Sequence, residues 1–163
     1  MSTIVTTDPS VSIVSDPNLS VTAAVDAAPR SLLPTGLVAG VLAAAAATAV
    51  ALVAKAAGVP MAAAPRGAAA GKDIPMWGFA MGTLMSVAIG AVLAAAIARW
   101  LHRPVRDFVA VTVALTLVSF FGPITTGHAT TATRLVLALT HVVAAAVAIP
   151  MLTAWVTARA ARS

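Results

Sequence analysis

Residues 75–98 read PMWGFAMGTLMSVAIGAVLAAAIA and contain no charged side chain. A helix rises 1.5 Å per residue, so about 20 residues span a hydrocarbon core of roughly 30 Å. The stretch is apolar on every side, whereas a helix that lies flat on a membrane surface carries one polar face. It therefore predicts a transmembrane helix.

Three further windows lack charged residues, and they cover residues 32–54, 108–133 and 135–158. We expect an all-α polytopic membrane protein, a four-transmembrane-helix bundle, with spans at about 32–55, 75–98, 105–124 and 134–157. The third span is the weakest, because its continuously apolar part meets Gly122 and Pro123 after Phe121. A re-entrant segment is the alternative there, and it would place the C-terminus on the opposite side of the membrane.

The composition of the whole chain points the same way. Of its 163 residues 60% are hydrophobic and 9% are charged, with a mean hydropathy of +0.99, whereas soluble domains carry about 25% charged residues. Such hydrophobicity also argues against a chain that is disordered throughout. The net charge of +5 does not predict a nucleic-acid partner, because the basic residues stand at the ends of apolar runs. The absence of cysteine excludes disulfides and Cys-ligated metals.

The positions of the basic residues predict an orientation. Arg99, Arg103 and Arg106 crowd one short loop, which the positive-inside rule places in the cytoplasm. Both termini would then be cytoplasmic in a multi-pass protein of the cell membrane. Residues 1–30 are polar and are expected to form a disordered cytoplasmic tail, and residues 159–163 form the cytoplasmic C-terminal end. Tryptophans are expected at the membrane borders, at Trp77, Trp100 and Trp155.

Two outer loops follow from this orientation. Residues 58–74 are rich in Ala, Pro and Gly and are expected to have little regular structure. Residues 125–133 form a polar segment rich in threonine that leads to Arg134.

Small residues recur at every fourth position in the first two predicted helices. Between membrane helices the hydrophobic effect nearly vanishes, and close backbone approach through small residues favours association. We expect the two helices to pack closely, within one chain or between two, through Gly36, Gly40, Gly78, Gly82, Ser86 and Gly90. Coincidence is the alternative, since alanine alone makes up about a quarter of the chain.

One ionisable side chain, His141, lies deep within a predicted span, about 10 Å along the helix from Arg134. Ionisable residues inside membranes are costly and are candidates for function. His141, Thr140 and Arg134 are therefore the candidate intramembrane polar site, and Thr112 and Thr116 are possible hydroxyl partners. The structural interpretation is a neutral histidine hydrogen-bonded between helices; the functional ones are a proton relay, a ligand contact or a metal ligand.

No phosphate-binding loop, paired carboxylates or metal motif appears in the sequence. We therefore predict no catalytic, cofactor-binding or metal residues, no cofactor and no enzyme. The first hypothesis is a structural or partner subunit in the cell membrane, in contact with the lipid bilayer and with its own copies or another membrane protein. The alternative is a small oligomeric transporter or channel with a pathway near His141. A membrane enzyme that acts on lipid is a weaker third.

The sequence resembles small four-helix membrane proteins of actinobacteria that carry only a domain of unknown function. The resemblance covers about residues 31–158, and residues 75–90 and 122–140 are its most recognisable parts. It implies a four-helix membrane domain, and it implies no site residues.

Overall fold

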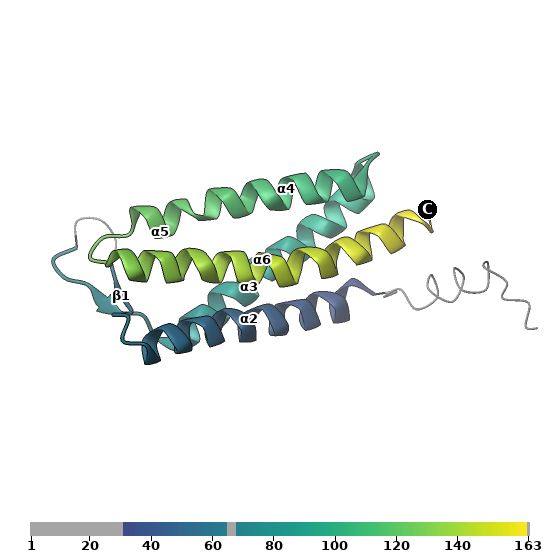
Figure 1. Cartoon of the computed structure of the whole chain (residues 1–163). Coiled ribbons are helices and arrows are strands. Elements are labelled where there is room, and N and C mark those ends of the chain that lie inside the picture. Colours follow the sequence, from purple (N-terminus) through teal and green to yellow (C-terminus); the bar gives the residue numbers. More distant parts are fainter. Residues whose placement is uncertain (1–30, 65–67, 163) are drawn as a thin grey trace, which may run out of the picture.

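The computed structural model describes residues 31–64 and 68–162 of the chain. Its elements, shown in Figure 1, are α2 (Leu32–Ala56), β1 (Ala62–Ala63), β2 (Lys72–Asp73), α3 (Met76–Trp100), α4 (Pro104–Ser119), α5 (Phe121–Thr125) and α6 (Thr131–Ala160). Within the described ranges, four helical segments are long and apolar enough to cross a membrane, α4 and α5 together forming one of them. The predicted all-α membrane architecture is confirmed. The predicted tail at residues 1–30 lies outside the described residues.

The third segment is the one for which a re-entrant path was the alternative. Phe120 separates α4 from α5, and α5 then continues alongside α6 (Figure 1). Pro123 falls in the first turn of α5, where the missing N–H of a proline breaks no helical hydrogen bond. The combined segment, Pro104–Thr125, has 22 residues, which favours a full crossing over a re-entrant path.

The helices do not pack as a regular square. α2 packs against α6 and α3, whereas α4 packs mainly against α6. Figure 1 shows that α3 crosses the bundle diagonally, from the C-terminal end of α2 to the start of α4. α3 and α4 therefore meet near their connection and diverge from it.

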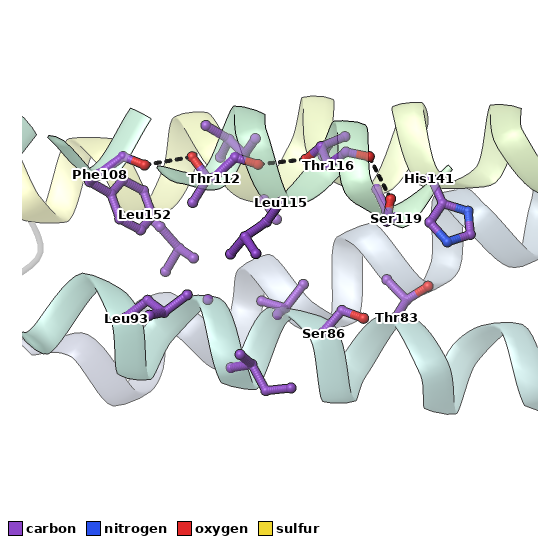
Figure 2. A pocket seen from close by; sticks show the side chains of 17 residues that line it. Thr83, Ser86, Leu93, Phe108, Thr112, Leu115, Thr116, Ser119, His141 and Leu152 are labelled. Atoms are coloured by element: carbon purple, nitrogen blue, oxygen red, sulfur yellow. Dashed lines mark hydrogen bonds between the residues drawn. The ribbon is translucent and has the colours of Figure 1, made fainter. Parts of the chain in front are cut away.

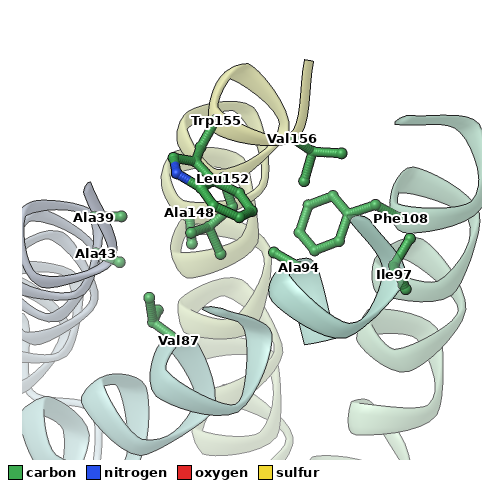
Figure 3. Close-up of a cluster of buried hydrophobic side chains, with 10 residues drawn as sticks. All are labelled: Ala39, Ala43, Val87, Ala94, Ile97, Phe108, Ala148, Leu152, Trp155 and Val156. Carbon is green, nitrogen blue, oxygen red and sulfur yellow. The ribbon is translucent and has the colours of Figure 1, made fainter. Parts of the chain in front are cut away.

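The largest buried cluster joins all four long helices and is shown in Figure 3. Phe108 of α4 and Val156 of α6 are fully buried in it, and alanines of α2 face them across the bundle. Trp155 also belongs to this cluster and is 6% exposed, whereas Trp77 and Trp100 are 69% and 72% exposed. Trp155 lies near the end of α6, as expected of a border residue, but its indole packs into the bundle and does not face the interface.

A small cap closes the end of the bundle at which α2 ends and α6 begins. β1 and β2 pair as an antiparallel hairpin, and Ala64 exchanges two backbone hydrogen bonds with Gly127, of 3.0 and 2.9 Å. The buried Thr133 side chain donates a hydrogen bond to the carbonyl of Pro60. The loop at residues 58–74, for which little regular structure was expected, is thus joined to both the 126–130 loop and α6.

Candidate functional site

The two glycines of α2 lie against α3. A Cβ atom on Gly36 would lie 3.3 Å from the Cβ of Ala91, and one on Gly40 would lie 3.2 Å from Cδ2 of Leu84. Both distances are shorter than ordinary van der Waals contact. The close approach of α2 and α3 therefore depends on the missing side chains at these two positions.

The small residues of α3 are placed differently from the prediction. Gly90 faces α6, where an added Cβ would lie 3.4 Å from Cδ1 of Leu152. A Cβ on Gly78 would meet only Cγ of Pro75, at 3.7 Å, and a Cβ on Gly82 would meet no atom of another side chain or helix among the described residues within 4 Å. Ser86 is exposed, and its hydroxyl donates to the carbonyl of Gly82 at 2.8 Å. These four residues are therefore not the surface that meets α2 within the chain.

Helix geometry explains this difference. Four residues turn an α-helix by about 40° more than one full turn, so a row of every fourth residue winds around the axis. From Gly78 to Gly90 the row rotates by about 120°, and it passes from open surface to the contact with α6. α2 instead meets α3 at Leu84, Val87 and Ala91.

His141 is half-buried on α6. Its Nδ1 lies 2.7 Å from the carbonyl oxygen of Leu137, one turn earlier in the same helix, and its ring centroid lies 6.4 Å from that of Phe120. The expected hydrogen bond between helices does not form. The hydroxyls of Thr112 and Thr116 donate to their own helix instead, to the carbonyls of Phe108 and Thr112 at 2.8 Å each.

Thr140 and Arg134 do not join His141 in one site. Thr140 is buried, and its hydroxyl also donates to the Leu137 carbonyl, at 2.7 Å. Arg134 is exposed, and its Nη2 donates to the carbonyl of Thr126 at 3.0 Å, within the cap of the bundle. The three predicted residues therefore have separate surroundings. Thr140 bonds within its own helix, Arg134 bonds to the loop before α6, and His141 lines a cleft.

That cleft lies between α3, α4 and α6 and has a volume of about 180 Å³. Its wall is mostly apolar, and Figure 2 shows the polar side chains that interrupt it: Thr83, Ser86, Thr112, Thr116, Ser119 and His141. Three of the hydroxyls come from α4 at spacings of four and three residues, which places them on one helix face. This spacing was visible in the sequence, but the contributions of Thr83 and Ser119 were not predicted.

Comparison with known families adds one finding. A family of unknown function (DUF6069) matches residues 27–158. The chain belongs to this family. No curated protein and no solved structure matches the chain.

The matched range contains the cleft and almost all of the bundle, and it ends at Ala158 near the end of α6. Membership in the family agrees with the resemblance to a domain of unknown function. The match does not address the organism, so an actinobacterial origin stays a prediction.

The chemistry of the cleft is limited to hydrogen bonding and apolar contact. No charged residue lines it. Nowhere in residues 31–64 and 68–162 do three His, Asp or Glu side chains gather as metal ligands do. The cleft has one imidazole and several hydroxyls, which can orient a polar group within an apolar surrounding.

Proposed function

We propose that this protein is a non-enzymatic, multi-pass protein of the cell membrane that serves as a subunit for another membrane protein. In this proposal both termini lie in the cytoplasm, and the partner contributes a transmembrane helix. The observation that carries the proposal is the open space over Gly82 on α3.

Gly82 lies in the middle of a helix in which an alanine would be favoured by about 1 kcal/mol. No contact within the described residues requires a glycine there, in contrast to Gly36 and Gly40. Gly78 and Ser86 extend the same surface by one turn in each direction, and Ser86 is exposed. Three small residues at this spacing allow the backbone of a second helix to approach closely. The two helices then make more van der Waals contact with each other than either would make with lipid chains.

The distribution of acidic groups supports a role without catalysis. The chain contains five acidic residues in total. Within the described ranges these are Asp73, in β2, and Asp107, in the first turn of α4. Neither lies in the middle of a membrane span, where a carboxylate would serve proton transfer.

Site-specific photocrosslinking in native membranes tests this function. A photoreactive residue replaces Met81, next to Gly82, and a second variant places it at Val53, which is exposed on a different helix, α2. We expect a crosslinked partner from position 81, none from position 53, and loss of the product when Gly82→Leu is added. A product that survives Gly82→Leu would contradict the proposal. A product of twice the mass of the chain would identify the partner as a second copy.

One observation favours the transporter or channel as a second candidate: His141 lines a cleft with five hydroxyl side chains. Purified protein in planar bilayers with potassium chloride tests it. A steady current that falls in His141→Phe would support a pathway there, and a current equal in both proteins would count against it.

A further inference from the structure

Four of the five hydroxyls that line the cleft already donate their protons to backbone carbonyls. Ser86 donates to Gly82, Thr116 donates to Thr112 and Ser119 donates to the carbonyl of Thr116 at 2.6 Å; Thr112 donates within α4 as well. Figure 2 shows the bonds that run along α4 as dashed lines. A hydroxyl that donates its proton to a carbonyl retains only lone pairs. These four side chains therefore present acceptors to the cleft.

His141 presents the same chemistry. The carbonyl oxygen of Leu137 can only accept, so Nδ1 carries the proton of the hydrogen bond at 2.7 Å. In the neutral ring Nε2 then has a free lone pair. Within residues 31–64 and 68–162 this Nε2 has no hydrogen-bond partner. A half-buried acceptor in an apolar wall costs free energy while it has no hydrogen bond, so a ligand that donates a hydrogen bond to it binds more favourably.

The remaining polar side chain is Thr83, whose hydroxyl forms no hydrogen bond with any described residue. It can donate as well as accept. Toward a ligand, five side chains of the cleft can therefore only accept a hydrogen bond. The sixth, Thr83, can accept one or donate one.

The position of the cleft limits the ligand further. Ile89 of α3 and Leu115 of α4 line it and are 55% and 48% exposed, so its mouth opens sideways between two membrane helices. His141 lies about 10 Å along α6 from Arg134, deep within the apolar segment. A volume near 180 Å³ holds more than the benzene that fills a cavity of about 150 Å³. A ligand therefore enters from the hydrocarbon region and brings little charge.

We propose that the cleft between α3, α4 and α6 binds a lipophilic alcohol from the bilayer, whose hydroxyl donates to Nε2 of His141. The apolar part of the ligand lies against Leu93, Leu115 and Leu152, and its tail extends through the opening between α3 and α4. This site shares Ser86 with the Gly82 surface, but the acceptor that carries it, Nε2 of His141, belongs to α6 and does not depend on the partner proposed above.

The test uses the full chain in phosphatidylcholine nanodiscs, because this lipid has no hydrogen-bond donor in its headgroup. The probe is a long-chain primary alcohol that carries a diazirine, and its methyl ether is the matched compound without the donor. Photolabelling is measured against concentration, and labelled peptides are identified by mass spectrometry. We expect label on α3, α4 and α6, and an apparent affinity about tenfold higher for the alcohol than for the ether.

Three variants locate the hydrogen bond. His141→Phe retains a ring beside Phe120 and removes the acceptor, so we expect the alcohol to fall to the affinity of the ether, which itself stays unchanged. Ala145→Leu adds a larger side chain to the wall of the cleft and is expected to block both compounds. Thr157→Val alters an exposed hydroxyl of α6 that donates to the Thr153 carbonyl and does not line the cleft, and it should leave both affinities unchanged.

Equal labelling by the alcohol and the ether, or labelling by the alcohol that His141→Phe leaves intact, would overturn the proposal. Competition by phosphatidylglycerol would also overturn it, because that lipid has its hydroxyls on a charged headgroup, which would have to leave the interface to reach His141.

Discussion

Gly40 and Gly82 both belong to rows of small residues at every fourth position in the sequence, but the structure places them in different surroundings. Gly40→Val should destabilise the bundle by about 1–3 kcal/mol, because the new side chain would collide with Leu84, whose Cδ2 would lie 3.2 Å from the added Cβ. Gly82→Val should change stability by less than about 0.5 kcal/mol in the isolated chain, because nothing lies within 4 Å. SDS-induced unfolding in mixed micelles, followed by circular dichroism, measures both. Equal effects would contradict the assignment of Gly40 to the α2–α3 contact.

Trp155 is the largest side chain of the buried cluster that joins the four long helices. Trp155→Ala should lower the free energy of unfolding by on the order of 3 kcal/mol, because it leaves a cavity beside Leu152 and Ala148. Trp77→Ala, at a site that is 69% exposed, is the control and should have little effect. The same SDS titration measures the difference, and a neutral Trp155→Ala would show that the indole is not part of the packed core.

These residues show where sequence reasoning stops at the smallest scale. The sequence identified His141 as the ionisable group deep in a span, but the acceptor that it meets, the Leu137 carbonyl, is a backbone atom of its own helix. No side-chain pattern predicts that choice. Likewise, glycine spacing predicted a tight contact, but the direction in which Gly82 points depends on how α3 is rotated in the bundle.

At the scale of elements, the first turn of α6 anchors the loops that close this end of the bundle. Thr130 is the N-cap residue, and its hydroxyl accepts from the backbone N–H of Thr133 at 3.1 Å. Thr130→Ala should therefore lower stability by about 1 kcal/mol. Thr131→Ala, at the exposed neighbouring position, provides the control. Thermal unfolding in detergent gives the comparison, and an equal shift in both variants would contradict a capping role.

The helices were predictable because charge-free windows of sufficient length have few other stable structures in a bilayer. The hairpin of β1 and β2 was not, because Ala62 and Ala63 have low β-propensity and pair only where the loop meets Lys72 and Asp73. The bridge from Ala64 to Gly127 joins positions 63 residues apart, so no local pattern encodes it. The cleft was not predictable for the same reason, because it depends on the diagonal course of α3 and not on a local pattern.

For the molecule as a whole, the described basic residues separate by end. Arg99, Arg103 and Arg106 lie where α3 ends and α4 begins, and Arg159 and Arg162 follow at the end of α6. The cap at the opposite end contains Lys72 and Arg134, and Lys55 lies in the last turn of α2. The positive-inside rule predicts a cytoplasmic position for the first group, and we therefore expect the cap on the outer side of the membrane.

The lack of native cysteine makes this orientation directly measurable. Gly71→Cys is unsuitable, because a Cβ there would lie 3.1 Å from that of His128. Ala69→Cys is exposed in the cap, and His102→Cys is exposed between α3 and α4. A membrane-impermeant maleimide should label the cap variant in intact cells and the other only after permeabilisation. The reverse pattern would place the cap in the cytoplasm, whereas labelling of both in intact cells would mean that α3 does not separate them. The mouth of the cleft opens toward the hydrocarbon region in either orientation, so the proposed route of a lipophilic ligand into the cleft does not depend on this result.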